Sequence, residues 1–284
     1  MPGLEAEVVD RVRAGVRRDG RIVVLTGAGV SAASGIPTFR GPEGWWTVGS
    51  VRYTPQQLAT AEMFGHQPEA VWSWYLSRLA VVREAEPNPA HDALVDLEAA
   101  LGDRFLLVTQ NVDGLHRRAG SVRLYEIHGA LELLRCAEGC VSELWPLPQQ
   151  LTTRSPGPEL TSADRRALTC PSCGSWLRPH VLWFDEVYDE RHFRLESTLA
   201  AAEEASLLLT VGTSGATTLP ALAVRAAAGA GATLVDVNPE ENPFGDAARQ
   251  AGGAVVREAA TDALPKLVKV VTGEAGRSGA GASR

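Results

Sequence analysis

The chain has 284 residues, of which 45% are hydrophobic, enough for the core of one or two domains. Its formal net charge of −7 argues against a nucleic-acid-binding surface. No stretch approaches the roughly 20 apolar residues of a membrane span, and the first residues contain no apolar signal-peptide core. We therefore expect a cytoplasmic protein that binds neither nucleic acid nor membrane. The oligomeric state stays open, a monomer included.

Short apolar runs alternate with helical stretches along most of the chain. Six runs indicate buried parallel strands: RIVVLTG, FLLVTQN, LYEIHG, LLLTVGTS, ATLVDVN and the weaker AVVREAA. Helical patterns are found in HDALVDLEAALGD and in the alanine-rich PALAVRAAAGAG. The alternation predicts an α/β fold with a doubly wound parallel sheet, Rossmann-like, with polar residues at the strand ends.

Two segments interrupt this alternation. Residues 43–90 are aromatic and partly helical without a convincing strand, and we expect a helical insertion that carries a cofactor loop. Residues 131–177 contain all four cysteines, and we expect a small zinc-binding domain. The remaining predicted parts are a Rossmann-like nucleotide-binding domain of residues 1–42, 91–130 and 178–272, and a disordered tail of residues 273–284.

The cysteines form two close pairs. Three residues separate Cys136 from Cys140, and two separate Cys170 from Cys173, both within the usual spacing of zinc ligands. In a cytosolic protein this arrangement favours one structural zinc ion over disulfides, and four thiolates leave no open position for catalysis. The alternative is a set of unrelated buried thiols, which would not be expected to pair twice within one segment.

The segment GAGVSAASGIPTFRG begins at Gly27, directly after the first apolar run. Gly27, Gly29 and Ala32 fit the G-x-G-x-x-G/A pattern, in which glycine lets the backbone approach a pyrophosphate. Alone, the pattern is equally consistent with a tight turn that binds no ligand. A dehydrogenase would carry an acidic residue at a strand end about 20 residues later, where this chain has the loop-like FRGPEGWWTVGSVRY. The dehydrogenase context is therefore missing.

A series of motifs resembles the sirtuins, the NAD-dependent protein-lysine deacylases, in content and in order. They are GAGVSAASGIPTFRG, TQNVDGLH, EIHG, the two cysteine pairs, RPHVLWFDE, VGTS and VDVNP, and the resemblance covers about residues 21–269. It implies that NAD is consumed: the amide oxygen of acyl-lysine attacks the ribose carbon as nicotinamide leaves. The implied products are free lysine and O-acyl-ADP-ribose, and the implied partners are acylated-lysine proteins or peptides.

The resemblance assigns two catalytic residues. His128 in EIHG would take a proton from a ribose hydroxyl, which suits a neutral imidazole near pH 7, and Asn111 would help to position the reacting groups. A buried histidine satisfied by the backbone is the alternative for His128, and an ordinary Asn/Asp turn is the alternative for TQNVDGLH. The implied cofactor-binding residues are Gly27, Ala28, Gly29, Ser31, Phe39, Arg40, Trp46, Gln110, Asn111, Asp113, Gly212, Thr213, Ser214, Asn238 and Ala260.

Four of these residues have side chains whose chemistry suits a particular part of NAD. Phe39 would screen the reacting ribose carbon from water, and Arg40 would hold phosphate. Gln110 suits a ribose because its amide both donates and accepts, and Asp113 suits the carboxamide of nicotinamide because that NH₂ needs an acceptor. Two other classes of function stay open: an NAD-dependent protein mono-ADP-ribosyltransferase and a non-catalytic NAD-binding module.

The stretch PEAVWSWYLSRLAVVREAEP predicts a helix from Pro68 to about Pro87, with Tyr75 and Arg78 on one face. By itself this spacing fits a solvated helix face. In a sirtuin-like chain it resembles the pair of lysine desuccinylases and demalonylases, in which guanidinium and phenol can hold an acyl carboxylate. We therefore expect succinyl- and malonyl-lysine to be preferred over acetyl-lysine. The other implied substrate residues are Ala59, which leaves room for a larger acyl chain, and Val181, Leu182, Trp183 and Phe184, which pair with the substrate backbone.

Overall fold

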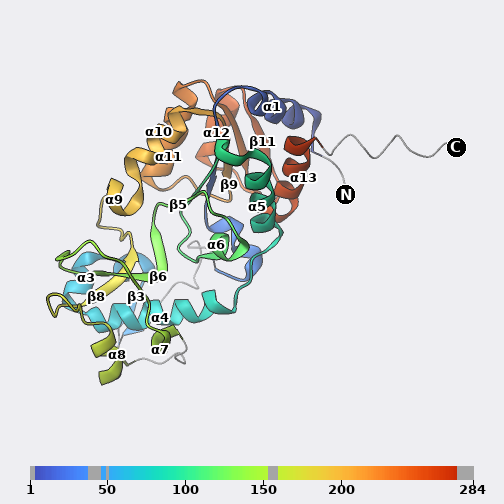
Figure 1. Ribbon diagram of the computed structural model, residues 1–284. Helices are drawn as coiled ribbons and strands as arrows, with labels where there is room; N and C mark the ends of the chain where they lie inside the picture. Colours follow the sequence, from blue (N-terminus) through green and yellow to red (C-terminus); the bar gives the residue numbers. More distant parts are fainter. Residues whose placement is uncertain (1–3, 38–45, 49–50, 153–158, 274–284) are drawn as a thin grey trace.

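The computed structural model describes residues 4–37, 46–48, 51–152 and 159–273, with the backbone alone at 46–48, 51 and 52. Six parallel strands form the main sheet in the order β11-β10-β9-β1-β4-β5 (Figure 1). They are β1 Arg21–Thr26, β4 Phe105–Thr109, β5 Leu124–Glu126, β9 Ala205–Val211, β10 Thr233–Val237 and β11 Ala254–Val256. The strand order reverses at β1, which confirms the predicted doubly wound α/β sheet.

Helices cover both faces of this sheet. One face carries α1 (Ala6–Arg17), α5 (Pro89–Leu101) and α13 (Ala260–Thr272), and the other carries α10 (Leu195–Glu203), α11 (Thr218–Gly229) and α12 (Pro243–Gln250). Ile22 and Val24 of β1 pack into the first core, and Val23 and Leu25 pack into the second. Successive side chains of a strand point to opposite faces, so a strand buried on both faces is apolar throughout, as RIVVL is.

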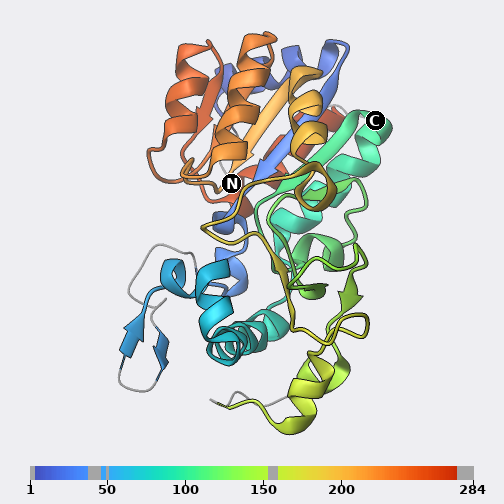
Figure 2. The same cartoon turned by 90° about the vertical axis from the view of Figure 1, so that its left-hand side faces the viewer.

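A second lobe lies at the side of the molecule away from this sheet (Figure 2). Its elements are β2 Trp46–Val48, β3 Val51–Tyr53, α2 Pro55–Leu58, α3 Ala61–His66, α4 Pro68–Glu84, β6 Gly129–Cys136, β7 Trp145–Pro146, α7 Gln149–Thr152, α8 Ser162–Ala167 and β8 Leu177–Val181. Trp72 and Leu76 of α4 share one apolar core with Leu134 of β6 and Leu177 of β8. The helical segment and the cysteine-bearing segment are thus packed together.

Local structure follows the predicted pattern in most places and departs from it in two. The predicted helix from Pro68 is α4, which begins with proline in its first turn and ends at Glu84. The sequence predicts no strand within residues 43–90, and this is wrong, because β2 and β3 form an antiparallel hairpin there. Strands of three residues are too short to show an alternating pattern. Strand β8 ends at Val181 and pairs with β6 in the second lobe, although it falls in the range predicted for the nucleotide-binding domain.

Most of the predicted C-terminal tail lies outside the described residues, and α13 ends at Thr272. Among the helices that the structure describes, none is both long and apolar enough to cross a membrane.

Candidate active site

The residues predicted to bind a cofactor follow the carboxyl ends of neighbouring strands. Gly27–Ser31 follow β1, Gln110–Asp113 follow β4, Gly212–Ser214 follow β9 and Asn238 follows β10. Parallel strands end at one edge of the sheet, so these segments lie together at the point where the strand order reverses. Ligands of doubly wound sheets bind at that point. Ala260 is the first residue of α13 and is buried, while Ser214 is half-buried.

Gly29 and Gly212 allow the loops after β1 and β9 to touch. The N–H of Gly29 donates to the carbonyl of Gly212 over 2.8 Å. A Cβ atom on Gly29 would lie 2.7 Å from the Cα atom of Gly212, and Gly212 has a φ of +60°, in the left-handed region. A side chain at either position would push the two loops apart. The sequence pattern attributes the need for glycine at position 29 to a bound phosphate. The structure adds a second reason, the close contact between the backbones of Gly29 and Gly212.

Ser31, Asn111 and Asp113 form one buried hydrogen-bonded group. Asn111 Nδ2 donates to Ser31 Oγ over 3.0 Å, and Ser31 Oγ donates to Asp113 Oδ2 over 2.7 Å. Asp113 Oδ1 accepts from the N–H of Leu115 over 2.9 Å, at the start of α6 (Leu115–Ala119). Each carboxylate oxygen has a second lone pair, so Asp113 can still accept an N–H from a ligand amide.

Gln110 links the ends of β4 and β9. Its Nε2 donates to Thr213 Oγ1 over 2.7 Å, and its Oε1 accepts from Thr217 Oγ1 over 2.8 Å. Asn238 Nδ2 donates to the carbonyl of Thr213 over 2.9 Å, which adds the end of β10 to the same network. Thr217, the N-cap of α11, is a member of this network that the motifs do not mark.

His128 lies two residues after β5 with its ring half-buried. Burial lowers the pKa of His128 to about 4, although a hydrogen bond to the carbonyl of Gln110 acts in the opposite direction. The ring is therefore neutral at pH 7, the state in which a histidine can take a proton. Its Nε2 atom lies 2.8 Å from the hydroxyl of Tyr188, whose pKa burial raises to about 12.

Sequence reasoning does not find Tyr188. It lies 60 residues from His128 and within VYDE, a stretch with no pattern that indicates a functional tyrosine. The phenol of Tyr188 reaches the imidazole of His128 because the fold brings the connection after β8 back to the end of β5.

Tyr75, Ala59 and Trp183, predicted as substrate residues, meet in the core of the second lobe. Trp183 Nε1 donates to Tyr75 Oη over 2.8 Å. The guanidinium of Arg78 lies 5.2 Å from the centre of the Trp74 ring, and burial lowers the pKa of Arg78 while nearby Tyr75 raises it. The structure thus brings a phenol and a guanidinium from α4 close to each other in apolar surroundings.

The segment Val181–Phe184 connects His128 to this core. Leu182 N donates to the carbonyl of His128 over 2.9 Å, and Phe184 N donates to the carbonyl of Ala59 over 3.0 Å. Trp183 N donates to Glu186 Oε2 over 2.9 Å. These three N–H groups are used within the chain, so the backbone groups that Leu182, Trp183 and Phe184 can offer a peptide are carbonyls. Phe184 has a side chain that is 58% exposed.

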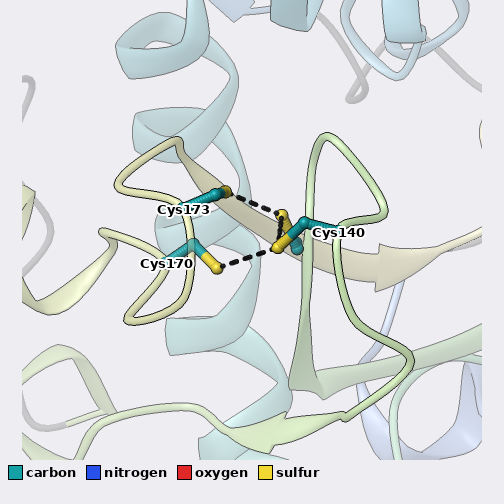
Figure 3. A group of neighbouring side chains, drawn as sticks. Cys140, Cys170 and Cys173 are labelled. Atoms are coloured by element: carbon teal, nitrogen blue, oxygen red, sulfur yellow. Dashed lines mark hydrogen bonds between the residues drawn. The ribbon is translucent and has the colours of Figure 1, made fainter.

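The four cysteines converge in the second lobe, where Figure 3 shows Cys140, Cys170 and Cys173 pointing toward one another. The sulfur of Cys140 lies 3.4 Å from that of Cys136 and 3.6 Å from that of Cys170, and all four sulfurs lie within 4.8 Å of one another. A tetrahedral zinc ion with Zn–S bonds of about 2.3 Å requires sulfurs roughly 3.8 Å apart. The donor set therefore fits one zinc ion with all four positions filled.

Residues 27–218 match the Sir2 family. The chain belongs to the Sir2 family. It is 45% identical over 241 residues to an NAD-dependent protein deacylase of Thermus thermophilus, covering 84% of this chain and 87% of that relative. A solved Sir2 homologue in complex with NAD is 32% identical with a TM-score of 0.75, and the match covers 96% of this chain and 97% of that one. A mutant Sir2 homologue in complex with 2′-O-acetyl ADP-ribose is 32% identical with a TM-score of 0.78, covering 97% and 99%.

Membership in the Sir2 family confirms the predicted co-substrate, NAD, and the strand-end residues of this Sir2 chain fit it. They combine close backbone contacts at the glycines, an acceptor at Asp113, and amide donors and acceptors at Gln110 and Asn111. The roles of individual residues remain predictions. Phe39 and Arg40 lie outside the described residues, and Trp46 begins β2 with only its backbone described.

Proposed function

We propose that this Sir2 chain, an NAD-dependent protein-lysine deacylase, prefers succinyl- and malonyl-lysine over acetyl-lysine. The observation that supports this is the placement of Tyr75 on α4 in one core with Ala59 and Trp183, with Arg78 of the same helix near enough for its charge to act on the phenol. A guanidinium can take a terminal carboxylate with two parallel hydrogen bonds, and a phenol can donate a third. An acetyl group has no carboxylate, so it cannot form these bonds.

The remaining residues have roles that follow from their chemistry. His128 would take a proton from a ribose hydroxyl, because its ring is neutral and half-buried at the end of β5. Gln110 and Asn111 would hold the ribose and a water molecule, and Asp113 would accept from the nicotinamide carboxamide. Leu182 would present the acyl-lysine next to the base, because its N–H is bonded to the carbonyl of His128.

A panel of acyl-lysine peptides tests the reaction and its preference together. Acetyl-, malonyl-, succinyl- and longer acyl-lysine peptides are incubated with the protein and NAD, and products are identified by mass spectrometry. We expect one nicotinamide per deacylated peptide and a higher kcat/KM for succinyl and malonyl peptides. Comparable deacylation without NAD would contradict the reaction. Label from NAD that stays on protein would indicate an ADP-ribosyltransferase instead.

Arg78→Met tests the source of the preference. Hydrogen bonds to a charged group contribute about 1.5–3 kcal/mol, so kcat/KM for the succinyl peptide should fall on the order of 10–100-fold. The acetyl peptide should lose much less. Arg83→Met, an exposed arginine of the same helix, is the matched control and should change neither rate. An equal loss on both peptides would show that Arg78 is structural.

A further inference from the structure

Trp183 and Tyr75 are joined by a hydrogen bond inside the core of the second lobe. The two residues are 108 positions apart, and their side chains are 2% and 5% exposed. An indole nitrogen can only donate, so the oxygen of Tyr75 must accept. The phenol therefore uses a lone pair on Trp183 and keeps its own proton for a different partner.

Tyr75 remains a donor throughout the physiological pH range. Burial raises the pKa of its phenol, and this outweighs the hydrogen bond from Trp183 and the nearby positive charges of Arg178 and Arg78. Arg78 is close enough for its charge to act on the phenol. An acyl carboxylate bound to Arg78 would therefore lie near the phenol of Tyr75, which can donate a hydrogen bond and does not ionise.

We propose that Trp183 is a positioning residue for acyl-chain selection. By occupying a lone pair of Tyr75 Oη, the indole sets the rotation of the phenol O–H bond and directs its proton toward the acyl carboxylate. This rests on the proposed function, because it assigns that carboxylate to Tyr75 and Arg78. It gives Trp183, whose backbone is predicted to pair with the substrate, a second role in which its indole acts through Tyr75.

Charged side chains from β6, from β8 and from the connection after β8 hold the indole in place. The guanidinium of Arg178 lies 3.3 Å from the centre of the Trp183 ring. Glu186 accepts from Trp183 N over 2.9 Å, from Arg178 Nη2 over 2.9 Å and from Arg135 Nη2 over 3.0 Å. Arg135 of β6 and Arg178 of β8 are opposite each other in the sheet, and Arg135 precedes the zinc-site residue Cys136. The sheet that contains β6 and β8 therefore supports Tyr75 through Trp183.

A purely structural role is the competing explanation, because Trp183 also packs against Phe64, with ring centres 5.1 Å apart. The two roles differ in their coupling to Tyr75. A residue that only fills the core affects both acyl substrates and acts independently of the Tyr75 hydroxyl. A residue that orients the hydroxyl has no effect on selection once that hydroxyl is gone.

The test is a double-mutant cycle of Trp183→Phe and Tyr75→Phe, with kcat/KM measured on succinyl- and acetyl-lysine peptides. Tyr75→Phe, which removes a hydrogen bond to a charged carboxylate, should lose on the order of 10–100-fold on the succinyl peptide and less on the acetyl peptide. Trp183→Phe, which removes one neutral hydrogen bond and keeps the phenol, should lose about two- to tenfold on the succinyl peptide and less on the acetyl peptide. The double variant should be no worse than Tyr75→Phe. Losses that multiply, or equal losses on both peptides, would overturn the inference and leave the acyl preference standing.

A second replacement keeps the test decisive if Trp183→Phe does not fold. Residue 183 is replaced by 3-benzothienylalanine, in which sulfur stands in place of the indole N–H and the shape is kept. We expect the same two- to tenfold loss on the succinyl peptide, and unchanged succinyl turnover would overturn the inference. Unchanged succinyl turnover in Tyr75→Phe, or a wild-type preference for acetyl, would instead refute the proposed function on which the inference rests.

Discussion

The predicted cofactor half of this site, at the strand ends, and the proposed acyl half, around Tyr75 and Trp183, are built in different ways. In the cofactor half, Ser31, Asn111 and Thr213 come together because β1, β4 and β9 are neighbours in the sheet. In the acyl half, Tyr75 and Trp183 come together through the packing of a second core. The first depends on backbone geometry at strand ends, and the second depends on side chains supported by the cysteine-bearing sheet. The two halves should therefore respond to different perturbations.

His128 belongs to both halves. Its ring contacts Tyr188 and the carbonyl of Gln110, and its own carbonyl accepts from Leu182 in the substrate segment. A change that disturbs one half should leave the other intact, whereas a change at His128 should lower turnover without unfolding either.

Removal of the metal should have the largest effect and should affect the acyl half first. Structural zinc contributes about 10–16 kcal/mol of apparent binding free energy in small zinc modules at pH 7, and this energy is coupled to folding. Cys173→Ser should therefore lower the stability of the second lobe and raise KM for the acyl peptide. Hydrogen exchange should show lost protection in α4 and β6, while β1 and β9 keep theirs.

Elemental analysis should find one zinc per wild-type chain and less in Cys173→Ser. Active protein without zinc would refute the metal site. Equal loss of protection in the sheet and in the second lobe would show that the two halves are not separable.

His128→Ala should have the next largest effect. Loss of a general base typically costs about 10²–10⁴-fold in rate, so kcat should fall by this amount. The melting temperature and the KM values for NAD and peptide should change little, because His128 is only half-buried. His66→Ala, an exposed histidine at the end of α3, is the matched control. Near wild-type turnover in a folded His128→Ala protein would remove His128 from the mechanism.

The same contrast explains how much could be predicted from the sequence. The central strands β1, β4 and β9 could be predicted because they are buried on both faces and therefore almost continuously apolar. The edge strands β5 and β11 are shorter and partly exposed, so their signal is weaker. The residues of the cofactor half could be predicted from the sequence because they directly follow strands of this sheet. The cysteine spacing predicts that the four thiols meet, since all four lie within one segment, and the structure brings them together.

Contacts between distant segments could not be predicted from local patterns. The bond from Trp183 to Tyr75 depends on packing within the second lobe, and the contact between Tyr188 and His128 depends on the return of the connection after β8 to the end of β5. The same holds for Gly29, where the sequence suggested room for a phosphate but gave no sign that Gly212 lies against it. Periodicity reveals which face of an element is buried and does not reveal its partner.

Gly29→Ala should have the smallest effect and should fall on the cofactor half. The new Cβ would lie 2.7 Å from Gly212 Cα and 2.8 Å from the Gly212 carbonyl oxygen, and both are backbone atoms that cannot rotate away. Overpacking typically costs about 1–3 kcal/mol, so the melting temperature should fall by a few degrees. If the shifted loop loses one or two contacts to NAD, KM for NAD should rise roughly tenfold, the equivalent of about 1.4 kcal/mol.

Gly65→Ala is the matched control, because the same added methyl group meets no atom within 4 Å there and lies in α3. It should leave KM for NAD unchanged and stabilise the helix slightly, since alanine is favoured over glycine in helices by about 0.5–1 kcal/mol. At saturating NAD, KM for the acyl peptide should stay within about twofold of wild type in Gly29→Ala, because an uncoupled, distant site shows little energetic cross-effect. A parallel rise in both KM values would mean that the loop after β1 also shapes the acyl half.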